Sequence, residues 1–232
     1  MKPKTIGVLG GLGPDTTAKF YLRLIKLSRE KNKKSYPSIV IHNLPVTFKV
    51  EENTAIKGIN LHQMLPFLVA GVKQLKLAKV DFIVIPCNTV HVFIDELRKT
   101  TQIPIISIID KTLEHIRKAG IHKVGLLATN KTIKSGMFTS HNTDQLKIIC
   151  PNKFEQQIVA RTISHILKNK ITNKDQTNLL KIIQNLKMKS AEAVILGCTD
   201  LQLIINAKNS PLTVCDTMEI LAQATVSELN NN

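Results

Sequence analysis

Two of the four cysteines stand where a thiol could do chemistry. Cys87 opens the stretch Cys-Asn-Thr-Val-His and Cys198 opens Cys-Thr-Asp, and a short apolar run precedes each one. If each run is a strand of a parallel sheet, its cysteine lies at the carboxyl edge, where such folds bind ligands. A helix that starts there stabilises a thiolate through its free N–H groups and its dipole. Each cysteine could then abstract a proton or act as a nucleophile; the alternative is a small apolar side chain that fills the core.

The other two cysteines lack this context. Cys150 precedes Pro151 and Cys215 stands in Val-Cys-Asp, so both are interpreted as structural. Four scattered cysteines without Cys-x-x-Cys or Cys/His ligand spacing predict neither a disulfide framework nor a structural zinc site. We therefore expect a cytoplasmic protein without a bound metal.

The sequence also contains an internal repeat of two short segments. Ile6–Gly10 is similar to Val124–Ala128, and Asp81–Cys87 is similar to Glu192–Cys198, in the same order along the chain. This pattern suggests a duplicated half, although short apolar strands also resemble one another by chance. If the duplication is real, each half carries a strand that ends in a cysteine.

Two halves related by a rough twofold would bring the two thiols face to face across a cleft. That geometry suits the removal of a proton from one face of a carbon and its return to the other face, with one sulfur as base and the other as acid. Cysteine suits both roles because its unperturbed pKa of about 8.5 lets a thiol and a thiolate coexist near neutral pH.

The elements that would position these residues follow from hydrophobic pattern. Short β-branched runs alternate with segments of helical period, which is typical of βα units on a parallel sheet. Strands are predicted at Thr5–Leu9, Ser38–His42, Asp81–Ile85, Pro104–Ser107, Lys123–Leu127, Leu146–Ile149, Ala193–Leu196 and Leu212–Val214. Helices are predicted near 15–30, 61–78, 90–99, 110–119, 154–169, 175–188, 200–206 and 217–229, with Asp15, Asp110 and Thr217 as capping residues.

The predicted fold class is α/β, with two pseudo-twofold-related domains, each a small parallel sheet flanked by helices. The first domain is expected to comprise residues 1–112 with 213–232, and the second residues 113–212. The active-site cleft is expected between them.

Composition limits the partners. The chain of 232 residues has 32 Lys and Arg against 17 Asp and Glu, a formal net charge of +15. The basic residues are spread along the chain, and with no Trp and two Tyr there is no evident platform for stacking bases, so nucleic-acid binding is not expected. The apolar runs are shorter than the roughly 18 residues of a membrane span. The positive charge favours a small anionic substrate.

Four motifs then resemble one family. They are Gly-Gly-Leu-Gly-Pro-Asp-Thr-Thr at 10–17, Pro-Cys-Asn-Thr-Val-His at 86–91, Ala-Thr-Asn-Lys-Thr-Ile-Lys-Ser-Gly at 128–136, and Gly-Cys-Thr-Asp at 197–200. Together, in this order, they are similar to the aspartate/glutamate racemase family, the cofactor-independent amino-acid racemases that use two cysteines. The resemblance covers nearly the whole chain.

The resemblance implies roles for residues beside the cysteines. Cys87 and Cys198 would be the acid/base pair, and Asn88, Thr89 and Thr199 would hold the substrate's carboxylate or amino group. No cofactor would be needed, the substrate would be a small, acidic amino acid, and the protein would be a homodimer.

Further candidate site residues follow from the motifs, and several of them also have a structural interpretation. Thr132 matches the last Thr of a family loop, and Lys168 matches a lysine for the side-chain carboxylate, or is a solvated lysine at a helix end. Gly11 belongs to a tight turn over the substrate, and Thr17 either offers a hydroxyl there or caps the helix. His91, four residues after Cys87, could tune the thiol or play a supporting or surface role.

Three positions depart from the family pattern. Val50 stands near the place where aspartate-selective members have an arginine, and Lys49 beside it could act only as a point charge. Lys131 replaces a glycine, and Asp200 shortens a glutamate without an evident reason. Strict aspartate preference is therefore in doubt, and related isomerases, decarboxylases or hydantoin racemases remain alternatives, as does a non-catalytic amino-acid-binding protein.

Overall fold

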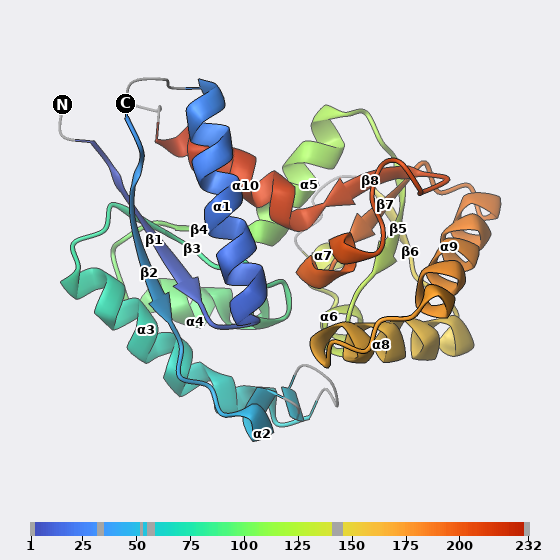
Figure 1. The fold of residues 1–232 in the computed structure, drawn as a ribbon, viewed down its shortest axis with the longest axis horizontal. Coiled ribbons are helices and arrows are strands. Elements are labelled where there is room, and N and C mark those ends of the chain that lie inside the picture. Colours follow the sequence, from blue (N-terminus) through green and yellow to red (C-terminus); the bar gives the residue numbers. More distant parts are fainter. Residues whose placement is uncertain (1–2, 32–34, 52, 55–58, 141–145, 230–232) are drawn as a thin grey trace. The chain divides into compact units, whose positions relative to one another are not determined.

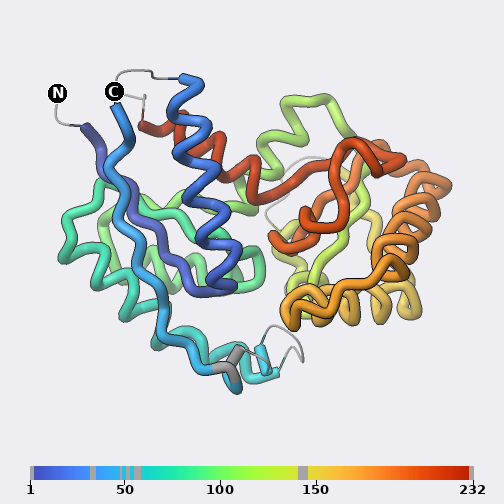
Figure 2. Tube along the Cα trace, viewed as in Figure 1, coloured from blue at the N-terminus to red at the C-terminus, as the bar shows by residue number. Residues whose placement is uncertain are grey.

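Short apolar runs form the inner strands of two parallel sheets in this protein. The computed structural model describes residues 3–31, 35–51, 53, 54, 59–140 and 146–229. The chain divides into two compact units, Met1–Lys111 with Met218–Asn232, and Thr112–Thr217. Figures 1 and 2 show the two units, which are described in turn.

The first unit contains a four-stranded parallel sheet of strand order β2-β1-β3-β4. Its strands are β1 (Thr5–Gly10), β2 (Ser38–Asn43), β3 (Phe82–Val84) and β4 (Ile105–Ile106). Its helical elements are α1 (Pro14–Lys31), α2 (Phe48–Glu51), η2 (Leu61–Met64), α3 (Leu65–Leu77), η3 (Thr89–Phe93), α4 (Ile94–Lys99), the start of α5 (Ile108–Lys118) and nearly all of α10 (Thr217–Glu228), where η marks a 3₁₀ helix. Figure 1 shows α1 beside α10.

The second unit repeats the strand order as β6-β5-β7-β8, again parallel. Its strands are β5 (Lys123–Leu127), β6 (Lys147–Ile149), β7 (Ala193–Leu196) and β8 (Thr213–Asp216). Its helical elements are α6 (Asn130–Ser135), α7 (Met137–Ser140), α8 (Lys153–Leu167), α9 (Asn173–Met188) and η4 (Thr199–Leu203), together with the rest of α5. The similarity of the two sequence halves thus corresponds to one topology built twice.

Burial explains why the inner strands read as continuous apolar runs. Strands β3 and β7 are buried at every residue, whereas the edge strands β2 and β6 contain only partly buried and exposed residues. Helices cover both faces of an inner strand, so it has no solvent-facing side to make polar. In the first unit, α3 and α4 pack on the sheet in one apolar cluster. In the second unit, α8 and α9 do so in another.

The predicted α/β class and all eight predicted strands are confirmed, within one or two residues at most ends. Helix α5 begins at Ile108, earlier than expected, because the Ser107 hydroxyl accepts a hydrogen bond from the Asp110 N–H at 3.1 Å. Ser107, and not Asp110, is therefore the capping side chain. The helix predicted at 200–206 is the shorter 3₁₀ helix η4.

Strand β8 pairs with β7 through Thr213↔Ala193 to Asp216↔Leu196. The chain therefore leaves the second sheet after β8, and the units divide between Thr217 and Met218. The expected division at 213 falls before this strand because the sequence does not show which sheet a short apolar run will join.

Candidate active site

Cys87 lies at the carboxyl edge of the first sheet. Strand β3 ends at Val84, and the Cys87 N–H donates to the Ile85 carbonyl at 2.8 Å, which turns the chain sharply. Cys87 is partly buried against the apolar cluster of this unit. Asn88 and Thr89, which start the 3₁₀ helix η3, are buried. The partly exposed thiol thus sits at the end of a buried strand, as its motif predicts.

His91 is tied to the backbone on both sides of its ring. Its Nδ1 lies 2.7 Å from the Cys87 carbonyl oxygen, and its Nε2 accepts a hydrogen bond from the Ile108 N–H at 3.2 Å. An Nε2 that accepts from an amide carries no proton, so we assign the neutral Nδ1–H tautomer, which donates to Cys87. Three roles were left open for His91, namely tuning the thiol, supporting the site and lying at the surface. This geometry favours the second.

The glycine turn after β1 is closed by Thr17. Its hydroxyl accepts from the Gly11 N–H at 3.0 Å and donates its proton to the Gly13 carbonyl at 3.1 Å. Gly11 has a φ of +83°, and a Cβ there would lie 2.5 Å from the Leu44 nitrogen, so only glycine fits this approach. Of the two interpretations of Thr17, its contacts match the one in which it secures the start of α1.

Cys198 occupies the equivalent position in the second unit. Only Gly197 separates it from the end of β7 at Leu196; it is partly buried, and its Sγ donates to the Asp200 Oδ2 at 3.8 Å. Thr199, which starts η4, is 4% exposed. A Cβ on Gly197 would lie 2.8 Å from Leu126 Cδ1 and 3.0 Å from Ala128 Cβ, so a side chain there would require its neighbours to shift. Asp200, which the sequence left uninterpreted, is thus the carboxylate beside this thiol.

Thr132 lies in the short helix α6, which follows β5, at the same edge of the sheet as Cys198. It is 1% exposed, and its hydroxyl lies 3.0 Å from that of Thr129, the residue that caps α6. Gln156 of α8 holds this loop by donating to the Ala128 carbonyl and to Asn130 at 3.0 and 2.9 Å. No motif pointed to Gln156, because its partners lie far away in the sequence.

Lys168 and Val50 lie at less enclosed positions. Lys168 is exposed and ends α8, the helix that packs against η4 after Cys198. Val50 belongs to the short helix α2, where it packs partly against the apolar cluster of the first unit. The predicted site residues therefore lie at the carboxyl edges of two different sheets. Those of the first sheet are Gly11, Thr17, Cys87, Asn88 and Thr89, and those of the second sheet are Thr132, Cys198 and Thr199.

The two remaining cysteines differ from this pair. Burial raises the pKa of Cys215 in β8 to about 11, so its thiol stays protonated at neutral pH. Cys150 is exposed in the segment between β6 and α8.

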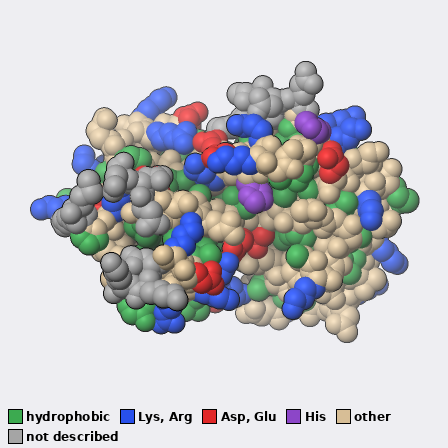
Figure 3. All heavy atoms as spheres, turned by 90° about the horizontal axis from the view of Figure 1, so that it is seen from above, with side chains coloured by type: hydrophobic (Ala, Val, Ile, Leu, Met, Phe, Trp, Pro, Cys, Tyr) green, Lys and Arg blue, Asp and Glu red, His purple; other side chains and the backbone are tan. Residues whose placement is uncertain are grey.

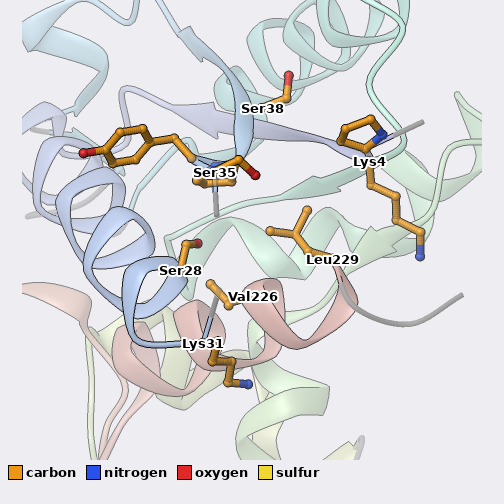
Figure 4. A pocket seen from close by; sticks show the side chains of 10 residues that line it. Lys4, Ser28, Lys31, Ser35, Ser38, Val226 and Leu229 are labelled. Atoms are coloured by element: carbon orange, nitrogen blue, oxygen red, sulfur yellow. The ribbon is translucent and has the colours of Figure 1, made fainter. Parts of the chain in front are cut away.

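A cavity of the first unit lies at the opposite, amino edge of its sheet. Lys4 precedes β1 in it, and its ammonium group donates to Glu228; the ammonium group of Lys31 donates to Ser227. Figure 4 shows both side chains, with that of Ser28, among those that line this cavity. The cavity is lined by Pro3, Lys4, Ser28, Lys31, Ser35, Tyr36, Pro37, Ser38, Val226 and Leu229. It contains none of the predicted site residues.

The surface charge forms no single basic patch on the face that Figure 3 shows, where Lys and Arg side chains are scattered. In the described residues, no helix is both long and apolar enough to cross a bilayer.

Comparison with known proteins gives one consistent family. The Asp/Glu/Hydantoin racemase family model matches residues 9–225. A broad-specificity amino-acid racemase of Bacillus subtilis is 27% identical over 226 residues, which cover 96% of each protein.

Solved structures agree. An aspartate racemase homologue of Pyrococcus horikoshii is 27% identical, with a TM-score of 0.80 over 98% of this chain and 100% of that chain. The aspartate racemase of Picrophilus torridus is 26% identical, with a TM-score of 0.82 over 99% and 95%. With two repeated parallel sheets and a family match over most of its length, the chain belongs to the Asp/Glu/hydantoin racemase family.

Proposed function

We propose that the protein is a cofactor-independent amino-acid racemase in which Cys87 and Cys198 act on opposite faces of one substrate carbon. The observation that carries this proposal is the equivalence of the two cysteines. Each follows the second inner strand of its sheet, β3 or β7, and each is partly exposed. A duplicated core that served only packing would need no thiol at that point in both copies.

The reaction needs one thiolate and one thiol. A Cys87 thiolate removes the Cα proton, the electron pair of that bond delocalises into the α-carboxylate, and the Cys198 thiol delivers its proton to the opposite face. The sulfurs then hold the reverse protonation states, and reaction from the other enantiomer restores them. Hydrogen bonds to the carboxylate stabilise the carbanion, for which we propose Asn88, Thr89 and Thr199.

Asp200 indicates which of the two cysteines is protonated before substrate reacts. Its carboxylate accepts the S–H of Cys198 at 3.8 Å, and a neighbouring negative charge favours the protonated thiol. We infer that Cys198 is the acid at rest and Cys87 the base.

For the substrate, we propose an amino acid with an acidic side chain, without strict preference for aspartate. The net charge of +15 favours anions, and Lys168 offers a cation in the same unit as Cys198. Val50 cannot pair with a carboxylate, and the relative from Bacillus subtilis carries the description broad specificity.

The decisive experiment is solvent exchange. L-aspartate, L-glutamate and neutral amino acids are incubated with the protein in D₂O without cofactor, while Cα–H exchange is followed by NMR and optical rotation by polarimetry. We expect exchange accompanied by loss of rotation. Binding without exchange would identify an amino-acid-binding protein, and conversion to another product would identify a different reaction of the superfamily.

Cysteine variants connect the reaction to its groups. We expect Cys87→Ser and Cys198→Ser each to abolish interconversion, because a hydroxyl near neutral pH neither takes up nor releases the proton as a thiol does. Cys150→Ser is the matched control and should retain nearly full activity. Interconversion that survives either of the first two substitutions would contradict the two-cysteine mechanism.

A further inference from the structure

The segment that carries Cys87 links the short strand β3 to the 3₁₀ helix η3 and is itself neither helix nor strand. A 3₁₀ helix has poorer hydrogen-bond geometry than an α-helix. A restraint from a neighbouring element would help to keep the Cys87 sulfur where it meets a substrate carbon.

His91 provides that restraint through the two hydrogen bonds described above. The side chain is 3% exposed, and its ring spans from the Cys87 carbonyl oxygen to the first amide of α5. Both ring nitrogens are engaged with backbone groups, so neither can take the proton of a thiol. Its influence on Cys87 must therefore pass through the backbone.

The Ile108 amide is a consequential partner. The first N–H groups of a helix have no acceptor within the helix, and a buried one left unsatisfied is costly. Ser107 serves the N–H of Asp110, while His91, 17 residues away in sequence, serves that of Ile108. Helix α5 is also where the chain passes from the first unit, which ends at Lys111, to the second.

We propose that His91 is a positioning residue, which holds the backbone of Cys87 against the start of α5 in the neutral Nδ1–H form. The inference rests on the proposed function for its effect on turnover, but not for its effect on the thiol. Misplacement of a reacting group by about 1 Å can slow a reaction by about 100-fold, so the loss of this link acts on kcat.

Two substitutions separate the bonds. The amide nitrogen of an asparagine lies near the Nδ1 of histidine, so His91→Asn keeps the donor to Cys87. The longer glutamine reaches the Nε2 position, so His91→Gln keeps an acceptor for Ile108 and loses the donor. Because the link needs both bonds, we expect His91→Gln and His91→Asn each to lower kcat by about 10- to 100-fold, with KM little changed in both. His115→Gln, at an exposed position of α5, is the control.

A second readout does not need catalysis. In a Cys150→Ser, Cys198→Ser background, Cys87 is the accessible thiol, because Cys215 is buried. We expect His91→Gln to change the alkylation rate of Cys87 by at least about threefold at constant secondary structure by circular dichroism, and His115→Gln to leave it unchanged. If the racemase proposal is wrong, the wild-type protein shows no turnover, but the difference in alkylation rate between His91→Gln and the wild type remains.

The inference is overturned if folded His91→Gln keeps the wild-type kcat and Cys87 alkylation rate, or if folded His91→Asn keeps the wild-type kcat. Should either variant fail to fold, the wild-type protein decides by ¹⁵N NMR of its histidine rings at pH 7. A proton on Nδ1 alone supports the inference, and a proton on Nε2 overturns it.

Discussion

Single residues distinguish the two thiols of this racemase-family protein. Cys198 donates to the Asp200 carboxylate, whereas the contact described for Cys87 is through its backbone carbonyl, with His91. The contacts described for the two cysteines thus involve different groups, a carboxylate for Cys198 and an imidazole for Cys87. A racemase that works in both directions still needs both sulfurs, but it need not begin each cycle symmetrically.

Removal of the Asp200 charge should make Cys198 more reactive. In a Cys87→Ser, Cys150→Ser background, we expect Asp200→Asn to speed alkylation of Cys198 by iodoacetamide at pH 7.5 by about two- to fivefold. This corresponds to about 0.4–1 kcal/mol, typical of a partly exposed charge interaction. Asp95→Asn, at an exposed position, is the control. A slower reaction would show instead that Asp200 withdraws the thiol proton.

The Thr17 hydroxyl should matter for stability. Thr17→Val keeps the shape but leaves the buried Gly11 N–H without its acceptor, so we expect a loss of about 1–3 kcal/mol in the free energy of unfolding, measured with urea. Thr17→Ser keeps the hydroxyl and should lose only about 1 kcal/mol for the missing methyl group. Equal losses in both variants would refute a role for the hydroxyl.

Among the elements, α10 completes the first unit from the far end of the chain. Arg23 of α1 makes two hydrogen bonds at 2.5 Å to the Glu219 carboxylate of α10, and Lys4 binds Glu228 at 3.1 Å. Burial alone would raise the pKa of Glu219, but hydrogen bonds from Arg23 and Gln223 and the charge of Arg23 outweigh it, so this pKa is lowered. The ion pair therefore stabilises the contact between α1 and α10.

This contribution should depend on pH with a definite sign. Because the pKa of Glu219 is lower in the folded state, its stabilisation is present above the unfolded value of about 4.3 and is lost as pH falls through the folded value. We expect Glu219→Gln to cost about 1–2 kcal/mol at pH 7 and much less near pH 3, by urea unfolding. Glu96→Gln, at an exposed site on α4, should cost little at either pH. A cost independent of pH would contradict the ion pair.

In the second unit, Asp175 links α8 to α9. Like Glu219, it stabilises the fold more at neutral pH than in acid. Its carboxylate accepts hydrogen bonds from the N–H and the hydroxyl of Thr172, which caps α9, and lies 2.9 Å from the His165 Nδ1 of α8. Its pKa is lowered despite burial, because these groups stabilise the carboxylate. Each unit thus has a carboxylate whose protonation in acid weakens the packing of its own helices.

For the whole molecule, the net charge of +15 is the property that no single site explains. A charge of this size attracts anionic substrates over distances comparable to the Debye length, about 10 Å at 0.1 M salt. It supports the proposal of acidic amino acids as substrates. It is not concentrated in one patch on the face shown in Figure 3.

Added salt should therefore act selectively. Raising NaCl from about 20 to about 200 mM is expected to lower kcat/KM for an acidic amino acid by about threefold, because screening weakens the attraction. For a neutral amino acid that the protein accepts, the same change should have little effect. Equal losses for both would exclude long-range attraction as the cause.

Much of this architecture follows from local sequence. The inner strands are buried on both faces, so they must be apolar throughout, and the runs ending near Cys87 and Cys198 reveal them directly. Helices α2, α6 and α7, of four to six residues, were not expected, because so short a segment spans fewer than two turns and its apolar pattern cannot repeat.

The sequence alone determined the α/β class, the eight strands with their repeated segments, and the place of both cysteines after apolar strands, because hydrophobic pattern and short motifs are local. Only the tertiary structure decided that β8 joins the second sheet, that His91 spans Cys87 and Ile108, and that Thr17 closes its own turn. These outcomes depend on which hydrogen-bonding group finds which partner once strands and helices pack together. Spacing along a chain does not encode that choice, since the partners meet only when the apolar faces are buried.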